Sequence, residues 1–353
     1  MKKLRVAMVG AGNIANTHLE AYKNLDNVEI VAACDINESR LNETCDIFGI
    51  EKRYTSETEM LKNEELDAVD VCVWNCNHAK CSIEALDAGL HVLCEKPMAT
   101  SAAEAEAMIE AAKRNNKLLM IGFVLRFDNE SNITKDFIDK GYLGDIYYSK
   151  ATYLRRHGAP GGWFANKALS AGGPVIDLGV HVIDLTRYLM GSPKPVSVFA
   201  STADKLKDRK GLKTDVAWKP KDAKPDDIYD VEDFAVALIK YEDGKTTLLE
   251  TSYSLNGEER TEKQLFGDKG GIKIDAEGMK IYTEMNGFLA DVKPDVRNYK
   301  FGRPLFEAEM AHFADCILNG TECIATAEDG LAVMKILDAI YESARTGHEV
   351  IIK

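Results

Sequence analysis

The sequence is short of basic residues, and this shortage excludes one class of partner. Among 353 residues, 44 lysines and arginines stand against 57 aspartates and glutamates, so the formal net charge is -13. A protein that binds nucleic acid or an anionic membrane needs a basic surface to meet phosphate groups. No basic stripe runs through this chain, and neither partner is expected.

Long hydrophobic runs and a secretion signal are missing as well. No run approaches the length of a membrane span, and the opening MKKLRVAMVG has no apolar core or cleavage site of a signal peptide. The eight cysteines lie mostly within apolar runs, as buried thiols do. Cys72 and Cys76 have a metal-like spacing, but no second pair follows them. A cytoplasmic protein with reduced thiols and no metal is expected.

The first part of the chain alternates apolar strands with helices. This alternation predicts an α/β fold whose parallel sheet is covered by helices on both faces, a doubly wound Rossmann domain over residues 1–123. Strands are expected at residues 4–9, 28–34, 68–74, 91–95 and 117–123, and helices at 13–24, 37–48, 78–88 and 101–115.

Beyond residue 123 the pattern changes to runs of strands. It predicts an α+β domain over residues 124–353 with a large, mostly antiparallel sheet. Strands are expected at residues 145–155, 194–202, 231–241, 245–254, 261–267 and 270–275, helices at 304–319 and 327–345, an exposed excursion at 203–230, and a final strand, EVIIK. An alternative for the final helix and strand is that they pack against the first domain.

A glycine-rich motif, GAGNIA at residues 10–15, joins the first strand to the first helix. Gly10 allows a tight turn, and Gly12 allows the backbone to approach a pyrophosphate. Asn13 and Ile14 open the helix, whose free N–H groups attract phosphate. The motif therefore predicts a dinucleotide site; a glycine turn without a ligand and an FAD site are the alternatives.

An acidic residue, Asp35, ends the second strand 20 residues after Ala15. A carboxylate at this place hydrogen-bonds the ribose 2′-hydroxyl and repels a 2′-phosphate. Its position favours NAD over NADP.

Several further motifs occur in a recognisable order: EKPMA (95–99), GFVLRF (122–127), GGPVIDLGVHVID (172–184) and AEDGLAVMKILDAIYESARTG (327–347). With GAGNIA, they make the chain resemble the Gfo/Idh/MocA family of NAD(P)-dependent oxidoreductases, which includes inositol and sugar dehydrogenases. The resemblance implies a Rossmann domain followed by a sheet whose open face forms a homodimer or homotetramer. It also implies that Lys96, Asp177 and His181 line the substrate pocket beside the nicotinamide.

The chemistry of alcohol oxidation fits these three residues. Histidine suits a general base near neutral pH, and a lysine can polarise the oxygen or share its proton. Whether Lys96 or His181 is the principal base stays open, with Asp177 in an orienting role. Asp184 is interpreted as structural. A metal bound by Asp177, His181 and Asp184 is not expected, because nicotinamide chemistry does not need one.

Other residues near the motifs are candidates for contact with the cofactor. Asn75 and His78 follow the third strand, and Glu95 precedes Lys96. Trp74 replaces the proline that many relatives have, which leaves its cofactor contact open, and His78 has the alternative of an ordinary helix-start histidine. A cis bond between Lys96 and Pro97 is possible.

Two candidates lie further along the chain. Arg126 is either a cofactor contact or one side of a salt bridge. The segment RRHGAPGGWF (155–164) either caps the pocket, with Arg155, His157 and Trp163 binding the substrate, or is a plain surface loop.

The leading hypothesis is an NAD-dependent dehydrogenase that acts on a ring secondary alcohol of a cyclitol, sugar or sugar derivative. The first alternative is an enzyme with a tightly held NAD, in which transient oxidation permits elimination or glycoside cleavage. The second alternative is a redox-sensing binding protein without catalysis.

Overall fold

The computed structural model describes residues 3–206, 209, 219–220, 223–224, 226–296 and 302–353. The chain divides into two compact units, one made of Met1–Phe127 with Gly302–Leu331 and the other of Asp128–Phe301 with Ala332–Lys353. These units are defined by compactness alone, so the functional boundary between residues 123 and 124 stays a prediction.

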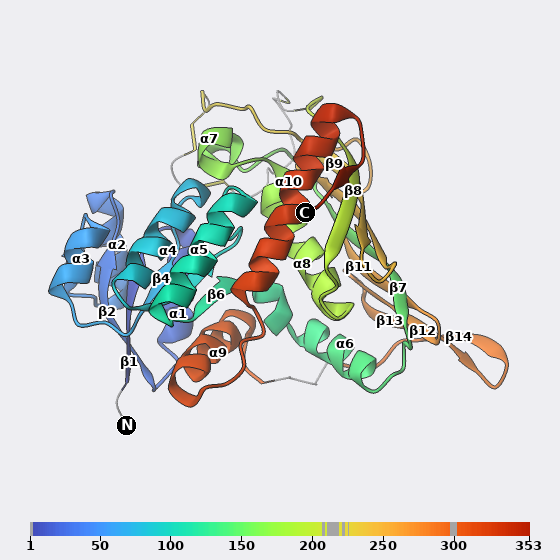
Figure 1. The fold of residues 1–353 in the computed structure, drawn as a ribbon, viewed down its shortest axis with the longest axis horizontal. Helices are drawn as coiled ribbons and strands as arrows, with labels where there is room; N and C mark the ends of the chain where they lie inside the picture. Colours follow the sequence, from blue (N-terminus) through green and yellow to red (C-terminus); the bar gives the residue numbers. More distant parts are fainter. Residues whose placement is uncertain (1–2, 207–208, 210–218, 221–222, 225, 297–301) are drawn as a thin grey trace. The chain divides into compact units, whose positions relative to one another are not determined.

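Unit 1 is built on a six-stranded parallel sheet with the order β3-β2-β1-β4-β5-β6. Figure 1 labels its strands β1, β2, β4 and β6. Its strands are β1 (Leu4–Val9), β2 (Val28–Cys34), β3 (Lys52–Tyr54), β4 (Ala68–Val71), β5 (His91–Glu95) and β6 (Leu119–Gly122). Its helices are α1 (Asn13–Tyr22), α2 (Glu38–Phe48), α3 (Glu57–Asn63), α4 (His78–Asp87), α5 (Ala102–Asn115) and α9 (Leu305–Asn319), with short helical turns η1 (Asn75–Asn77) and η2 (Val124–Phe127).

This strand order explains the apolar sequence of the central strands. All four residues of β4 and of β6 are buried, because helices cover both faces of the sheet. The chain adds β2 and β3 on one side of β1 and then β4, β5 and β6 on the other side, so the strand order reverses between β1 and β4. In sheets of this kind, a crevice forms at the carboxyl ends of the strands at this point. The fold therefore places a ligand site after β1 and β4.

The close approach of β1 and β4 depends on Gly10. This residue has φ +102°, and a Cβ built on it would lie 2.2 Å from the carbonyl oxygen of Cys72. An L side chain is excluded by both the backbone conformation and the contact. β4 ends at Val71 and not at the predicted residue 74, although the Cys72 N–H still bonds the Val9 carbonyl oxygen at 2.7 Å.

Unit 2 contains a nine-stranded sheet with the order β14-β13-β12-β11-β7-β10-β9-β8-β15. The strands are β7 (Ile146–Leu154), β8 (Pro195–Ala203), β9 (Phe234–Tyr241), β10 (Thr246–Ser252), β11 (Arg260–Gly267), β12 (Gly270–Asp275), β13 (Gly278–Met285), β14 (Phe288–Val292) and β15 (Val350–Ile351). Neighbouring strands are antiparallel except for the parallel pair β7 and β10. This arrangement confirms the predicted fold class.

The helices of unit 2 begin with α6 (Asn129–Asp139) and continue with the turn η3 (Gly162–Ala165), α7 (Lys167–Ser170), the π-helix η4 (Val175–Gly179) and α8 (Val180–Leu189). The last helix, α10 (Ala327–Thr346), is shared between the two units. Strand alternation shows which face of the sheet is covered: Ala235, Ala237 and Ile239 of β9 are buried, whereas Leu238 is exposed.

One apolar helical stretch is longer than was expected from the sequence. Lys167–Leu189 is long and apolar enough for a membrane span by length and composition, which corrects the expectation that no run approaches that length. Within its apolar window, 72% of the residues are buried inside the protein, as in the core helix of a soluble domain. The stretch is therefore weak support for a membrane span.

Several elements were missed from the sequence: β3, α3, α6, β13 and β14. The pair β13 and β14 had a readable signal, because Asn286 and Gly287 join them with positive φ at both residues, as a two-residue hairpin turn requires. β3 is only three residues long and has no apolar pattern. Part of the predicted excursion at 203–230 lies outside the described residues.

Candidate active site

The glycine motif in unit 1 forms a turn that is open to a ligand. Gly12 caps α1 with an extended backbone, and among the described residues no side chain bonds the cap. A Cβ on Gly12 would meet no atom within 4 Å, in contrast to the crowded Gly10. Asn13 is exposed and Ile14 half-buried at the same helix start. The free N–H groups and the open space fit a phosphate.

Asp35 stands beside this turn at the end of β2. One carboxylate oxygen accepts the backbone N–H of Ala11 at 2.8 Å, and the other accepts that of Asn37 at 2.7 Å. These bonds hold a negative charge next to the glycine turn. The geometry fits a ribose with free hydroxyls better than one with a 2′-phosphate.

The loop after β4 is joined to the Lys96–Pro97 turn by His78. Its ring nitrogens lie 2.6 Å from the carbonyl oxygen of Pro97 and 3.1 Å from that of Val73. Burial lowers the pKa of His78, so the ring is neutral at pH 7 and donates only one of these contacts. His78 is 1% exposed, and its position indicates a brace between two loops.

The Lys96–Pro97 peptide bond is cis, and Lys96 is half-buried between neighbours that are buried. In the loop after β4, Asn75 is buried and Trp74 keeps part of its surface exposed. Unit 1 thus brings the predicted cofactor residues of the glycine turn, this loop and the Lys96 turn to the carboxyl ends of its strands.

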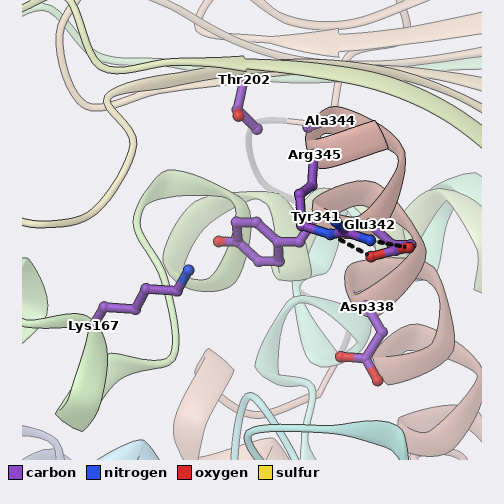
Figure 2. A pocket seen from close by; sticks show the side chains of 7 residues that line it. All are labelled: Lys167, Thr202, Asp338, Tyr341, Glu342, Ala344 and Arg345. Atoms are coloured by element: carbon purple, nitrogen blue, oxygen red, sulfur yellow. Dashed lines mark hydrogen bonds and ion pairs between the residues drawn. The ribbon is translucent and has the colours of Figure 1, made fainter. Parts of the chain in front are cut away.

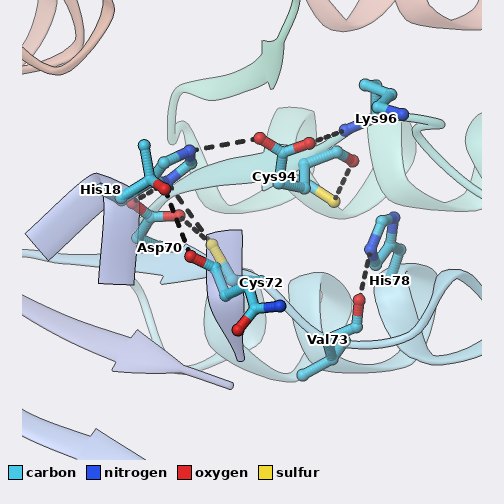
Figure 3. Close-up of polar contacts among 10 residues, drawn as sticks. His18, Asp70, Cys72, Val73, His78, Cys94 and Lys96 are labelled. Atoms are coloured by element: carbon cyan, nitrogen blue, oxygen red, sulfur yellow. Dashed lines mark hydrogen bonds and ion pairs between the residues drawn. The ribbon is translucent and has the colours of Figure 1, made fainter. Parts of the chain in front are cut away.

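A buried polar network joins His18 and Asp70 to the backbone of Lys96 (Figure 3). The Nδ1 atom of His18 is 2.9 Å from Asp70 Oδ2, and its Nε2 atom is 3.2 Å from Glu95 Oε1. The other oxygen of Glu95 accepts the backbone N–H of Lys96 at 3.0 Å. Burial opposes a charge on His18, but Cys72 and Asp70 beside the ring outweigh it and raise its pKa well above the usual value. The raised pKa favours a protonated His18, which pairs with Glu95, and Glu95 in turn accepts the Lys96 backbone N–H.

Arg126 also lies in unit 1, where its guanidinium is buried. It forms an ion pair with Asp329 at 2.9 Å and donates to the carbonyl oxygen of Ile324. Of the two interpretations made from the sequence, these contacts fit the salt bridge. Any additional contact of Arg126 with a cofactor stays a prediction.

In unit 2, the two glycines before Asp177 are explained by close contacts. A Cβ on Gly172 would lie 1.9 Å from the Tyr341 hydroxyl, and one on Gly173 would lie 2.3 Å from the Glu232 carbonyl oxygen. The Glu232 carboxylate accepts the N–H of Gly173 at 3.1 Å, the N–H of Val175 at 3.2 Å and the hydroxyl of Tyr341 at 2.9 Å. Glu232 thus takes the place of a helix cap supplied from a distant part of the chain.

The helix that follows starts as the π-helix η4, and its widened turn carries Asp177. From residue 172 to residue 187, only Asp177 and His181 keep exposed surface, whereas Asp184 is 1% exposed. The Tyr253 hydroxyl donates to Asp177 Oδ2 at 3.0 Å. The structure therefore separates Asp184 from the pair that is open to a ligand. π-Helical turns occur frequently at functional sites.

The loop at 155–164 divides into two groups of contacts. Arg155 donates to the Tyr153 hydroxyl at 3.0 Å; burial opposes its charge, but the neighbouring Tyr153 oxygen and Asp177 carboxylate outweigh burial and raise its pKa. His157 instead pairs with Glu259 at 3.1 Å, and Trp163 stacks on Phe164. Arg155 thus belongs with Asp177, whereas His157 contacts the residue that precedes β11 and Trp163 contacts its neighbour within the loop.

A cavity of about 540 Å³ opens on unit 2 beside Tyr341 (Figure 2). Its lining comes from α7, β8 and α10, with the ammonium of Lys167 5.7 Å from the Tyr341 ring centre. None of the predicted site residues lines this cavity. Tyr341 lines this cavity and also donates its hydroxyl to Glu232.

Several residues of these arrangements were not found from the sequence, among them His18, Glu232, Tyr253 and Tyr341. His18 is eight residues after Gly10 on a helix face that looks apolar, and only its partners reveal its charge. Glu232 and Tyr341 are 59 and 109 positions from their contacts, so no spacing rule links them.

Replacement of His18 by Asn should leave the buried carboxylates of Asp70 and Glu95 without a cation. We expect a loss of roughly 3 kcal/mol in unfolding free energy at pH 7, measured by urea denaturation. Because the folded-state pKa of His18 is raised above 6.5, its stabilisation is complete below that pH and decreases as the pH rises through the folded-state value. The variant should lack this decrease. A variant as stable as the wild type contradicts the network, and His348→Asn, at an exposed histidine, is the control.

Replacement of Glu232 by Ala should leave the N–H groups of Gly173 and Val175 and the Tyr341 hydroxyl without an acceptor. We expect a loss of about 2–4 kcal/mol in unfolding free energy, and Glu232→Gln should lose less because it retains one acceptor oxygen. Glu342→Ala removes an exposed carboxylate from the same helix as Tyr341 and should leave stability unchanged. Equal stability of Glu232→Ala and Glu342→Ala would refute the capping role.

Comparison with known proteins agrees with this geometry. The family model described as "Oxidoreductase family, NAD-binding Rossmann fold" matches residues 4–123, and the one described as "GFO/IDH/MocA C-terminal domain" matches residues 133–273. The chain is 33% identical to D-glucoside 3-dehydrogenase of Escherichia coli (strain K12), over 98% of this chain and 97% of that protein.

Solved structures show the same architecture over the whole chain. An aldose-aldose oxidoreductase from Caulobacter crescentus, complexed with glycerol, has a TM-score of 0.83 and 28% identity, and covers 99% of this chain and 100% of its own. Levoglucosan dehydrogenase in complex with NADH has a TM-score of 0.85 over 100% of both chains, and its 23% identity makes it a likeness of fold. These findings confirm the resemblance seen in the motifs: the chain belongs to the Gfo/Idh/MocA family of oxidoreductases, with an NAD-binding Rossmann fold.

Proposed function

We propose that this protein is an NAD-dependent dehydrogenase that oxidises a ring secondary alcohol of a sugar, a glycoside or a cyclitol. The observation that carries the proposal is the open glycine turn with Asp35 fixed beside it. This arrangement leaves a space at a helix N-terminus for a phosphate and holds a carboxylate for ribose hydroxyls.

Bound NAD supplies the acceptor for the hydride. The N–H groups at the start of α1 bind its phosphates, and Asp35 selects the ribose. Lys96 stabilises negative charge on the substrate oxygen, and His181 takes the hydroxyl proton. Asp177, steadied by the Tyr253 hydroxyl, orients the ring, and Arg155 binds polar groups of the substrate.

The class of substrate is narrowed by the relatives. The relative at 33% identity is a D-glucoside 3-dehydrogenase, and the one at 28% identity is an aldose-aldose oxidoreductase. Both names describe sugars with several ring hydroxyls. A glucoside is therefore the first substrate class to test, with free aldoses and inositols next.

The test is an anaerobic assay of the purified protein with NAD and a panel of methyl glycosides, aldoses and inositols. We expect the NADH absorption band to rise with at least one glucoside. Lys96→Met should lower kcat by at least about 100-fold, because an acid–base or electrostatic contact is lost. NADH binding, followed by fluorescence, should persist, and exposed Lys23→Met should behave as wild type.

Each other outcome of this assay has a definite meaning. Full activity of Lys96→Met would refute the role of the lysine. Absence of NADH with every alcohol, together with no NAD binding, would refute the dehydrogenase. Consumption of a glycoside without net NADH favours transient oxidation by a tightly held cofactor.

We further propose a cytoplasmic homodimer or homotetramer that assembles through the open face of the unit 2 sheet. On that face Phe199 pairs with Leu238, and Leu238 pairs with Leu248, which forms an apolar row across three strands. Phe199 and Leu238 are 53% and 40% exposed. Light scattering at micromolar concentration tests this assembly. A monomer there would contradict it, and Leu238→Lys should dissociate the oligomer.

A further inference from the structure

A cluster of soft ligand atoms lies in unit 1, away from the residues of the proposed reaction. His312 and Cys316 are one turn apart on α9, and Cys323 lies in the segment that follows this helix. One ligand atom from each residue lies within 4.8 Å of the other two, and all three residues are partly exposed. We propose that His312, Cys316 and Cys323 bind a soft metal ion of the zinc type, with a water molecule in the fourth position.

The spacing of the ligand atoms fits such an ion. In a tetrahedral site with Zn–S bonds of about 2.3 Å and Zn–N bonds of about 2.0 Å, neighbouring ligand atoms lie roughly 3.5–3.8 Å apart. The distance from His312 Nε2 to Cys316 Sγ is 3.4 Å. Cys316 and Cys323 are hydrogen-bonded to each other through their sulfurs. Small side-chain rotations are enough to close the three atoms around one ion.

The segment that carries Cys323 is held firmly in place. The carbonyl oxygen of Ile324 accepts from buried Arg126, and that of Ala325 accepts the Ile121 N–H at 3.0 Å, which ties the segment to β6. The Ala325 backbone also hydrogen-bonds the Cys323 sulfur, a contact that favours the thiolate. The third ligand is thus fixed beside α9 by bonds that do not involve the ion.

The charge balance of binding follows from the groups around the cluster. Burial raises the pKa of both thiols, that of Cys316 to about 12, so both carry protons at pH 7. Binding breaks two S–H bonds, forms two metal–sulfur bonds and one metal–nitrogen bond, and releases two protons to solvent. Asp315 and Asp329 favour a cation there, whereas Arg126 opposes one.

One existing contact must give way. His312 Nε2 accepts the backbone N–H of Ile324 at 3.1 Å, and the same lone pair is needed by the ion. Burial lowers the pKa of His312, so its ring is neutral at pH 7 and this lone pair does not carry a proton. Access is open on one side, because Cys323 lines a cavity of about 460 Å³ between α5 and the start of α10.

A second cluster of candidate ligand atoms differs from the cluster at α9 in its burial. His18, Asp70 and Cys72 also lie close together, but all three are fully enclosed and already bonded to one another. No route for an ion is evident among these described residues, and their arrangement serves the network under Lys96. Partial exposure is therefore what distinguishes the cluster at α9.

The test uses the full-length protein, reduced, stripped with a chelator and titrated with Co²⁺, followed by competition with Zn²⁺. We expect one ion per chain, a thiolate-to-cobalt charge-transfer band and tetrahedral d–d bands. Cys316→Ser and Cys323→Ser should each weaken binding by at least about tenfold and lower the charge-transfer intensity. Cys81→Ser, at a half-buried cysteine of α4, is the matched control and should bind as wild type.

Stability and cofactor binding provide independent readouts. Zn²⁺ should raise the Tm of the wild type and of Cys81→Ser, but not that of the double variant Cys316→Ser/Cys323→Ser, whose NADH titration shows whether it is folded. Absence of saturable Co²⁺ binding, or equal binding by the double variant, would overturn the proposal. A Cys316–Cys323 disulfide that persists after reduction would also overturn it. None of these outcomes depends on the substrate.

Discussion

The carboxyl ends of β1 and β4 approach so closely that residue 10 must lack a side chain. A Cβ there would overlap the Cys72 carbonyl oxygen at 2.2 Å, and the positive φ is one that only glycine adopts without cost. Because Gly10 permits this contact, β1 and β4 pair in parallel at the point where the strand order reverses. The open turn at Gly12, the Asp35 carboxylate and the Lys96 turn all lie at the edge that it creates.

Buried charge supports this edge from below. His18 is held between Asp70 and Glu95, and Glu95 bonds the Lys96 backbone. A Cβ on Gly122 would lie 3.1 Å from Glu95 Oε1, so the carboxylate also depends on a glycine in the next strand. The network thereby fixes the backbone of Lys96 through buried polar contacts.

In unit 2, buried polar contacts likewise fix the helix that carries Asp177 and His181. Its helix start has no local cap, and Glu232 and Tyr341 supply the acceptor from distant segments. Between residues 172 and 187, Asp177 in the π-helical turn and His181 in α8 are the partly exposed positions. The two glycines of this stretch serve the packing of Glu232 and Tyr341.

The sequence by itself determined the class of fold, the glycine turn, the acidic residue after β2 and the candidates Lys96, Asp177 and His181. The fold class, the glycine turn and the acidic residue depend on strand–turn–helix order and short spacing, whereas the three candidates follow from motifs that resemble those of the Gfo/Idh/MocA family. Only the tertiary structure decided that His18 lies between Asp70 and Glu95, that Arg126 is paired with Asp329, and that Glu232 caps a helix 59 residues away. It also decided that Cys323 joins His312 and Cys316. The physical reason is that charge state and partnership depend on burial and on contacts between distant segments, which neither composition nor periodicity records.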